Sequence, residues 1–132
     1  MPEWLEASDV KHFHQALIEE FGGLHGIRDE GALESTLARP INLVGYEPAT
    51  PLHELAASYG FGFARNHVFN DGNKRISLTV IDVFLLLNGR KLIAEEVEVV
   101  CVIRDVASGE MDEANLATWI LENSDEYDLD AN

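Results

Sequence analysis

A long apolar segment, residues 76–87, is the feature that most limits how this chain can fold. It reads Ile-Ser-Leu-Thr-Val-Ile-Asp-Val-Phe-Leu-Leu-Leu, with a polar loop before it and Asn88-Gly89 after it. A helix that is apolar on most sides is buried among other elements of a protein. No apolar run reaches the roughly 18 residues that suggest a membrane span. We therefore expect a globular domain built around a helix over residues 73–87.

The remainder of the 132-residue chain also has a helical pattern, which predicts an all-α fold. We expect one compact single-domain helical bundle of about six helices over residues 1–123, followed by an acidic, frayed tail at 124–132. The other expected helices are 8–21 with Ser8 as cap, 29–38 capped by Asp29 and stopped by Pro40, 50–66 with Thr50 as cap and Pro51 in first position, 95–107, and 112–123 with Asp112 as cap.

Two segments need a decision between structures. Residues 97–103 are β-branched and compatible with a strand, but we assign them to a helix because partner strands are missing. Residues 41–50 are expected to be extended or irregular. In the helix over 8–21, one apolar face is expected to hold Val10, Phe13, Leu17 and Phe21.

Composition limits the functions that the chain can have. The net charge of −15 argues against sequence-independent binding of nucleic acid and favours basic protein partners. The single cysteine, Cys101, lies in an apolar stretch, so we expect a buried small side chain rather than a reactive thiol or a disulfide. The N-terminus is acidic and lacks the cationic start of a signal peptide. We therefore expect a cytoplasmic protein with no direct nucleic-acid or membrane partner.

The loop before the apolar helix, residues 67–75, reads His-Val-Phe-Asn-Asp-Gly-Asn-Lys-Arg. The start of a helix exposes N–H groups and a dipole that favours anions, so this position suits a phosphate. His67 is a candidate base for removing a proton from a hydroxyl, and Asp71 is a candidate ligand for Mg²⁺ against phosphate oxygens. Taken singly, His67 is also compatible with a surface histidine and Asp71 with an ordinary turn. Together they indicate transfer of a phosphate-containing group.

The other loop residues have distinct expected roles. Gly72 allows positive φ and close approach of a ligand, and Asn73 can cap the helix or donate to a phosphate. Lys74 and Arg75 supply cations, although cations at a helix N-terminus oppose the helix dipole. Such a local conflict is typical of a functional site. Phe69 is expected to point inward as a structural anchor.

The same residues resemble the signature of the Fic/Doc family, His-x-Phe-x-(Asp/Glu)-(Gly/Ala)-Asn-x-Arg, from His67 to Arg75. The similarity continues through residues 84–89, and residues 27–40 and 55–61 are also similar to this family. The resemblance covers about residues 5–123.

Two positions resemble the death-on-curing (Doc) branch of the family. Lys74 stands where adenylyl-transferring Fic proteins usually have Gly, and Leu78 stands where they usually have a second Arg. The resemblance implies a toxin of a toxin–antitoxin pair that presents the γ-phosphoryl group of ATP, with Mg²⁺, to a Thr or Ser hydroxyl. The implied target is elongation factor Tu, and the implied inhibitor is an antitoxin whose disordered segment folds on the toxin. The resemblance further implies that modification of this target inhibits translation.

In that scheme the implied catalytic residues are His67, Asp71, Lys74 and Arg75, with Asp71 on the metal. The implied nucleotide-binding residues are Gly72, Asn73, Lys74 and Arg75. Residues 41–50 correspond in position to the flap that aligns a target peptide.

Three alternatives remain open at this point. One is a Fic-type adenylyltransferase, because both chemistries share the core signature. Another is a non-catalytic interaction module, since a fold does not fix a function. Finally, residues 118–123 match an inhibitory pattern of some Fic proteins, (Ser/Thr)-x-x-x-Glu-(Gly/Asn), but they also suit a plain amphipathic helix with Trp119 and Ile120 inward.

Overall fold

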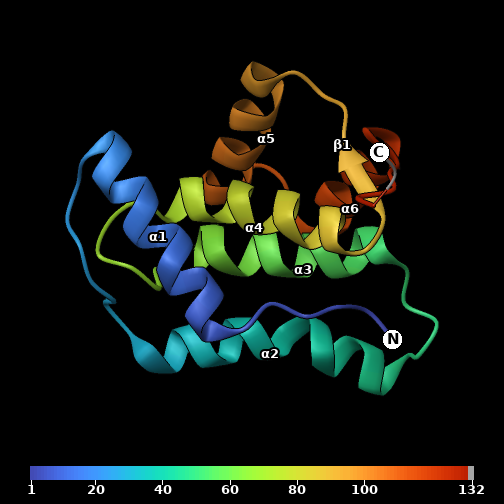
Figure 1. Ribbon diagram of the computed structural model, residues 1–132, viewed down its shortest axis with the longest axis horizontal. Helices are drawn as coiled ribbons and strands as arrows, with labels where there is room; N and C mark the ends of the chain where they lie inside the picture. Colours follow the sequence, from blue (N-terminus) through green and yellow to red (C-terminus); the bar gives the residue numbers. More distant parts are fainter. Residues whose placement is uncertain (131–132) are drawn as a thin grey trace.

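Six helices and one short two-stranded sheet form the fold in the computed structural model, which describes residues 1–130 (Figure 1). This confirms the predicted all-α fold. The elements are α1 Ala7–Phe21, α2 Glu30–Tyr46, α3 Leu52–Arg65, α4 Asn73–Leu87, β1 Arg90–Leu92, α5 Glu96–Ser108, α6 Glu113–Glu122 and β2 Ser124–Glu126.

Helix α3 lies at the centre of the fold, in contact with α2, α4, α5 and α6. Nine of its 14 residues are buried, compared with six of the 15 residues of α4. The apolar helix α4 therefore covers the central helix rather than being the most buried element itself, and its Leu87 is 43% exposed. The buried residues of α3 are mostly small: Ala56, Ala57, Ser58, Gly60, Gly62 and Ala64, beside Leu55, Tyr59 and Phe63.

Small side chains bring α3 and α4 close together along their length, and the two helices lie side by side in Figure 1. The Ser77 hydroxyl of α4 donates to the carbonyl of Gly60 in α3 at 2.6 Å. A Cβ atom at Gly60 would overlap the Ile81 side chain of α4. This contact fixes α4, and with it the loop that precedes α4.

The bounds of α4 agree with the prediction of residues 73–87. Gly72 begins the helix in the left-handed conformation, with φ 77°. At the other end the N–H of Asn88 donates to the carbonyl of Leu85 at 3.0 Å, and Gly89 follows with φ 84°. The polar loop and the Asn-Gly pair thus limit the helix as the sequence indicated.

Helix α2 is longer than the sequence predicted, because Pro40 lies inside it instead of ending it. Proline removes one backbone N–H and so one helical hydrogen bond, at a cost of about 3 kcal/mol. Neighbouring contacts offset this loss: the Arg39 guanidinium donates to the Ser58 carbonyl at 2.8 Å and to Glu113 Oε1 at 2.6 Å. The prediction of an irregular segment over 41–50 is therefore wrong for residues 41–46.

Two predicted helix starts are displaced by one or two residues. Helix α1 begins after Glu6, whose N–H donates to Asp9 Oδ2 at 2.9 Å, so Ser8 lies inside the first turn. The Thr50 hydroxyl turns back to the carbonyl of Glu47, at 2.6 Å, and cannot cap α3, which begins after Pro51.

The caps of α2 and α6 are confirmed. Asp29 Oδ1 accepts from the N–H of Ala32 at 3.0 Å, and Asp112 Oδ1 accepts from the N–H of Asn115 at 2.8 Å. The assignment of the β-branched run to a helix is also confirmed by α5. Cys101 of α5 is half-buried rather than buried.

Strands β1 and β2 pair in antiparallel fashion, with Arg90 opposite Glu126. The Arg90 guanidinium donates to the carbonyl of Ser124 at 2.7 Å. We expected a frayed tail here, but its residues 124–126 form β2; residues 131–132 of that tail lie outside the described part of the chain.

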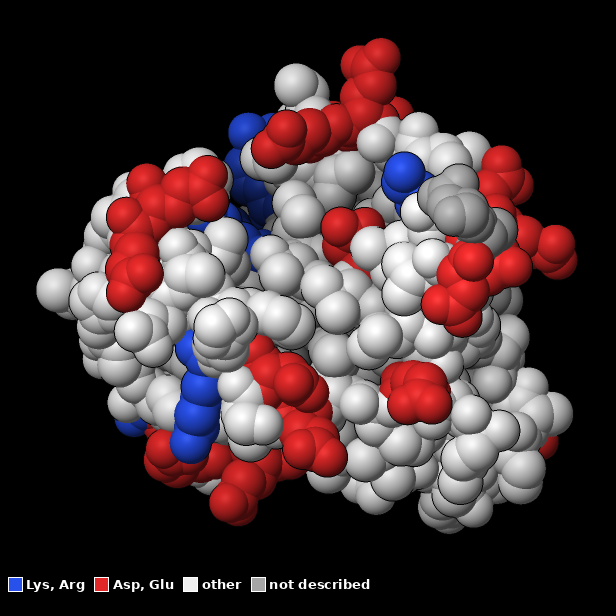
Figure 2. Space-filling view, viewed as in Figure 1, with Lys and Arg blue, Asp and Glu red and all other residues white. Residues whose placement is uncertain are grey.

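Acidic side chains are spread over the visible face of the molecule and basic ones are few, in keeping with the net charge of −15 (Figure 2). A protein of this charge attracts an anionic ligand only through a local arrangement of donors and cations. Within residues 1–130, no helix has both the length and the apolar character needed to cross a membrane.

We predict that Gly60→Ala lowers the free energy of unfolding by about 1–3 kcal/mol, because the added methyl group overpacks the contact with Ile81. Gly45→Ala in α2 is the matched control. A Cβ there meets nothing within 4 Å, so this variant should gain about 0.5–1 kcal/mol from its better helix propensity. Urea unfolding measures both values, and equal effects of the two substitutions would contradict close packing at Gly60.

A second prediction concerns the half-buried Asp82 of α4. Burial raises the pKa of this carboxyl above its ordinary value of 3.8, while the Lys91 ammonium acts to lower it. A raised pKa stabilises the folded state only where the carboxyl is protonated, and this contribution is lost as the pH rises through the folded pKa. We expect Asp82→Asn to raise the melting temperature at neutral pH, and the difference from wild type to shrink as the pH falls toward 3.8. Thermal unfolding at several pH values measures this, with the exposed Asp125→Asn as control.

Candidate active site

The backbone of the loop between α3 and α4 is held by the segment that precedes α2. Phe69 forms an isolated antiparallel bridge with Ile27, and the N–H of Asn70 donates to the carbonyl of Gly26 at 3.1 Å. The Val68 carbonyl accepts from the N–H of Arg28 at 2.8 Å. The candidate site is thus supported from one side by a two-stranded arrangement.

His67 has a φ of 48°. Among the described residues it is the only non-glycine residue with a positive φ. This left-handed conformation is uncommon outside glycine, and such outliers cluster at functional sites. The side chain is exposed, while the His67 carbonyl accepts from Nη1 of Arg28 at 3.4 Å. The candidate base is therefore open to solvent on a constrained backbone.

Asn73, the first residue of α4, holds the backbone of Phe69 on both sides. Its Oδ1 accepts from the Phe69 N–H and its Nδ2 donates to the Phe69 carbonyl, each at 3.0 Å. The Phe69 ring itself is buried. One hydrogen of Asn73 Nδ2 remains for a ligand, because an amide nitrogen carries two.

The N-terminus of α4 has no side-chain cap. Within residues 1–130, the backbone N–H groups of Asn73, Lys74 and Arg75 have no hydrogen-bond acceptor. No acidic side chain lies in the first turn to offset the helix dipole. This end of α4 is therefore an anion-binding position in both geometry and charge.

The Asp71 carboxylate lies beside this helix end. Its Oδ1 accepts from the Gly72 N–H at 3.0 Å and its Oδ2 from the Leu24 N–H at 3.3 Å. The approach to Gly23 is so close that a Cβ there would lie 2.6 Å from Oδ2. Each oxygen has accepted one hydrogen bond and keeps a free lone pair.

A magnesium ion fits this arrangement when phosphate oxygens share it. Mg²⁺ prefers oxygen ligands and binds one or two carboxylates together with substrate phosphate. In the described part of the chain, no group of three or more His, Cys, Asp and Glu side chains could hold a metal. Asp71 is thus suited to a metal that arrives with a phosphate ligand.

Two cations complete the first turn of α4. Lys74 is exposed and has no ion-pair partner among the residues that the structure describes. The Arg75 guanidinium lies 4.2 Å from the centre of the Phe21 ring, at the end of α1. Phe21 is 53% exposed, so its predicted place on a buried face is wrong, and the ring instead supports this guanidinium.

Leu78 and Glu122 do not add charged groups to the site. Leu78 is half-buried and packs against the core. Glu122 ends α6 and is followed by Asn123, whose carbonyl accepts from the Ile93 N–H beyond β1 at 2.8 Å. That contact places Glu122 near the C-terminal end of α4. Because a 15-residue helix is about 22 Å long, Glu122 lies far from the loop at the other end of α4. The expected amphipathic helix is supported by the buried Ile120 and half-buried Trp119.

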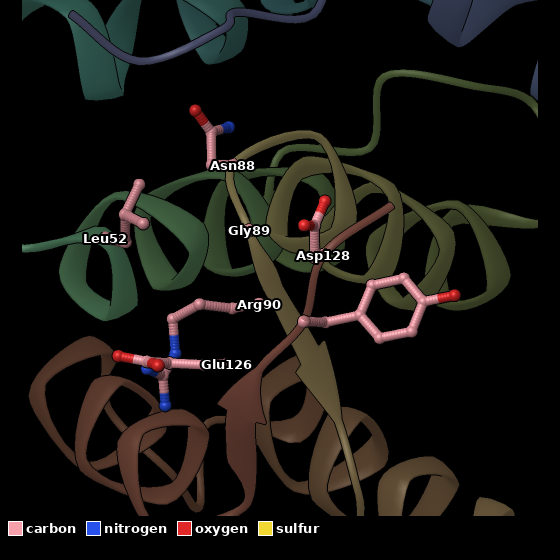
Figure 3. A pocket seen from close by; sticks show the side chains of 7 residues that line it. Leu52, Asn88, Gly89, Arg90, Glu126 and Asp128 are labelled. Atoms are coloured by element: carbon pink, nitrogen blue, oxygen red, sulfur yellow. The ribbon is translucent and has the colours of Figure 1, made fainter. Parts of the chain in front are cut away.

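One surface hollow lies away from the loop. It has a volume of about 560 Å³ and is bounded by the end of α4 and the strand pair, with Asn88, Arg90 and Asp128 on its lining (Figure 3). A second hollow, of about 370 Å³, lies behind the loop and is lined in part by His14 and Phe69. His67, Asp71 and the first turn of α4 are not among the lining residues of either hollow.

Three contributions to the site could not be identified from the sequence pattern. His14 contacts the loop from α1, Arg28 contacts the His67 carbonyl, and the Leu24 N–H contacts the Asp71 carboxylate. For His14 the sequence holds one signal: it is four residues from Val10 and four from Ile18, so it shares a helix face with two apolar residues.

Comparisons with known proteins show the family of the chain. The model of the Fic/DOC family matches residues 4–85. A protein named Protein kinase doc, from Escherichia phage P1, is 36% identical over 104 residues, which cover 79% of this chain and 82% of the relative. Toxin Doc from Mycolicibacterium smegmatis is 36% identical over 96 residues, 72% of each chain. The chain therefore belongs to the Fic/Doc family. Within that family it is a Doc-like member.

We predict that Asn73→Ala loosens the loop, because the part-buried Phe69 N–H then loses its acceptor. The expected loss in free energy of unfolding is about 1–3 kcal/mol. Hydrogen exchange at the Phe69 amide should accelerate more than exchange in the centre of α3. The exposed Asn115→Ala in α6 is the control, and equal exchange at Phe69 in both variants would contradict the clamp.

Proposed function

We propose that this chain is a Doc-type toxin that transfers the γ-phosphoryl group of ATP to a Thr or Ser hydroxyl of a protein target. The target proposed is elongation factor Tu, whose modification would inhibit translation in the cytoplasm. The observation that carries the proposal is the uncapped start of α4, with its unpaired N–H groups and two cations next to Asp71 and His67.

The first part of the mechanism is the binding of the phosphates. The N–H groups of Asn73, Lys74 and Arg75 would donate to phosphate oxygens at the positive end of the helix dipole. Lys74 adds a point charge, and Arg75 can bind two oxygens at once. These donors are fixed before the ligand arrives, so they need no reorganisation as negative charge develops.

Asp71 would hold Mg²⁺ on the phosphates through the free lone pairs of its carboxylate. When bound there, the metal would supply positive charge against the phosphoryl oxygens. The contacts of Asp71 with Gly72 and Leu24 fix the direction in which the carboxylate points.

His67 would act as the base for the target hydroxyl. The hydroxyl oxygen bonds to the γ-phosphorus, its proton passes to the imidazole, and the bond to the β-phosphate oxygen breaks to release ADP. The exposed position of His67 allows access by a protein substrate. Most of the rate gain in such a transfer comes from positioning and electrostatic stabilisation.

Two residues favour γ-phosphoryl transfer over transfer of AMP. Lys74 brings a charged side chain to the position that is usually Gly in adenylyl-transferring Fic proteins. It therefore narrows the space through which the nucleotide would pass. Leu78 packs against the core where those proteins place a second Arg. The site therefore has one cation fewer than the sites of adenylyl-transferring Fic proteins, which bind the triphosphate in the arrangement that transfers AMP.

The names of the relatives, Protein kinase doc and Toxin Doc, support the same assignment. A toxin of this kind implies an antitoxin. We infer that a disordered segment of the antitoxin folds on this domain, and the acidic surface favours a segment that carries basic residues.

Paired labelling tests the proposal. Purified protein, Mg²⁺ and elongation factor Tu are incubated with ATP labelled at the γ-phosphate or at the α-phosphate. We expect label from the γ-phosphate only, and a loss of about 10²- to 10⁴-fold in its transfer for His67→Ala.

His12→Ala removes an exposed histidine of α1 and is the matched control, with transfer equal to wild type. Label from the α-phosphate would instead establish AMP transfer. No label from either position, with intact ATP binding, would favour an interaction module.

A further inference from the structure

His14 is a buried histidine that the mechanism above does not use. It lies on α1, is 4% exposed, and belongs to the stripe that packs against the rest of the fold. Its Nε2 lies 2.8 Å from the carbonyl oxygen of Asp71, 57 residues further along the chain. The ring stacks on Phe69, with 3.9 Å between ring centres and 9° between ring planes.

We propose that His14 is a positioning residue that sets the direction of the Asp71 carboxylate toward the metal on the bound nucleotide. This inference rests on the proposed function, because it assigns Asp71 to Mg²⁺. His14 does not touch the reacting groups in this account; it acts through Asp71.

The chemistry of the contact defines what His14 must provide. A carbonyl oxygen only accepts hydrogen bonds, so Nε2 of His14 carries the hydrogen and donates it. Neither Phe nor Leu at this position could supply that donor. The imidazole is therefore more than an apolar ring in the core.

Asp71 is held at three points, and His14 supplies the one on its backbone. Its carboxylate oxygens accept from the Gly72 and Leu24 N–H groups, while its carbonyl accepts from His14. Rotation of the peptide that follows Asp71 would swing the Gly72 N–H away from Oδ1. The imidazole prevents this rotation by holding the carbonyl of the same peptide.

The stack on Phe69 connects the contact to the rest of the loop. Phe69 is buried, paired with Ile27 and clamped by Asn73. His14 thus rests on the most firmly held residue of the loop while it donates to the metal-binding residue. Outer-shell contacts of this kind commonly change metal affinity by about 10- to 100-fold when they are removed.

Two substitutions separate the donor from the ring. His14→Phe keeps an aromatic ring over Phe69 and removes the donor. His14→Gln loses the ring and keeps an N–H at about the reach of Nε2. Isothermal titration gives the affinity for ATP with Mg²⁺ and with EDTA, and their ratio is the gain in affinity due to the metal.

We expect His14→Phe to reduce this metal-dependent gain by about tenfold, with little change in the affinity measured in EDTA. His14→Gln should retain most of the gain, although its melting temperature falls. A purely structural role would instead make the ring-keeping variant resemble wild type and the ring-losing variant the defective one. That outcome would overturn the inference.

Asp71→Asn distinguishes the inference from the proposed function. If wild type shows no gain with Mg²⁺, the assignment of Asp71 fails, and the proposed function with it. A different result would reject only the role of His14: wild type shows the gain with Mg²⁺, Asp71→Asn loses this gain, and His14→Phe keeps it.

A measurement on the wild-type protein keeps the inference testable if His14→Phe does not fold. Nitrogen-15 NMR of the histidine side chains should find the hydrogen of His14 on Nε2. Its signal should shift when Mg²⁺ and ATP are added together, and not with ATP in EDTA. A hydrogen on Nδ1 alone would overturn the inference.

Discussion

The close contact of α3 with α4 is the constraint on which the rest of the structure depends. Gly60 leaves room for Ile81, and its carbonyl accepts from the Ser77 hydroxyl, so the two helices are fixed in both distance and register. The contact therefore fixes the position of the start of α4 and of the loop that precedes it. An uncapped helix end is costly to bury, because its N–H groups need partners. Here that end reaches the surface, where a phosphate can supply them.

The loop gains its shape from contacts made by three parts of the chain: α1, the segment between α1 and α2, and Asn73 at the start of α4. From α1, His14 contacts the Asp71 carbonyl and Phe21 contacts the Arg75 guanidinium. In the α1–α2 segment, residues 26–29 pair with the loop backbone and the Leu24 N–H donates to the Asp71 carboxylate. Asn73 closes the loop on itself. In a chain with a net charge of −15, this loop places two cations, Lys74 and Arg75, at an uncapped helix start. In the proposed function, an acidic protein would bind a polyanion in this way, because nearby donors at short range outweigh a distant field that salt screens.

Most of the fold could be predicted from the sequence where local signals were strong. The bounds of α4 followed from a polar loop and an Asn-Gly pair, and Asp29 and Asp112 cap their helices as expected. The continuation of α2 through Pro40 was not predicted: Pro40 is buried, and the partners of the adjacent Arg39 are distant in sequence. Three-residue strands have no periodicity to detect. The loop motif identified the candidate site, but the contacts of His14, Leu24 and Arg28 with the loop join residues 39 to 57 positions apart and could not be read from a local pattern.

Asn88 has a role that extends beyond ending a helix. Its side chain accepts from the N–H of Glu3 and donates to the carbonyl of Glu3, while the neighbouring Gly89 carbonyl accepts from the N–H of Tyr127. The first residues of the chain and the strand after α6 are thus gathered at one end of α4, and the loop lies at the other (Figure 1). Labels or fusion partners attached through either of these segments would point away from the loop. The protein could therefore be immobilised on a surface or joined to a reporter while the loop with His67 stays open to the proposed protein substrate.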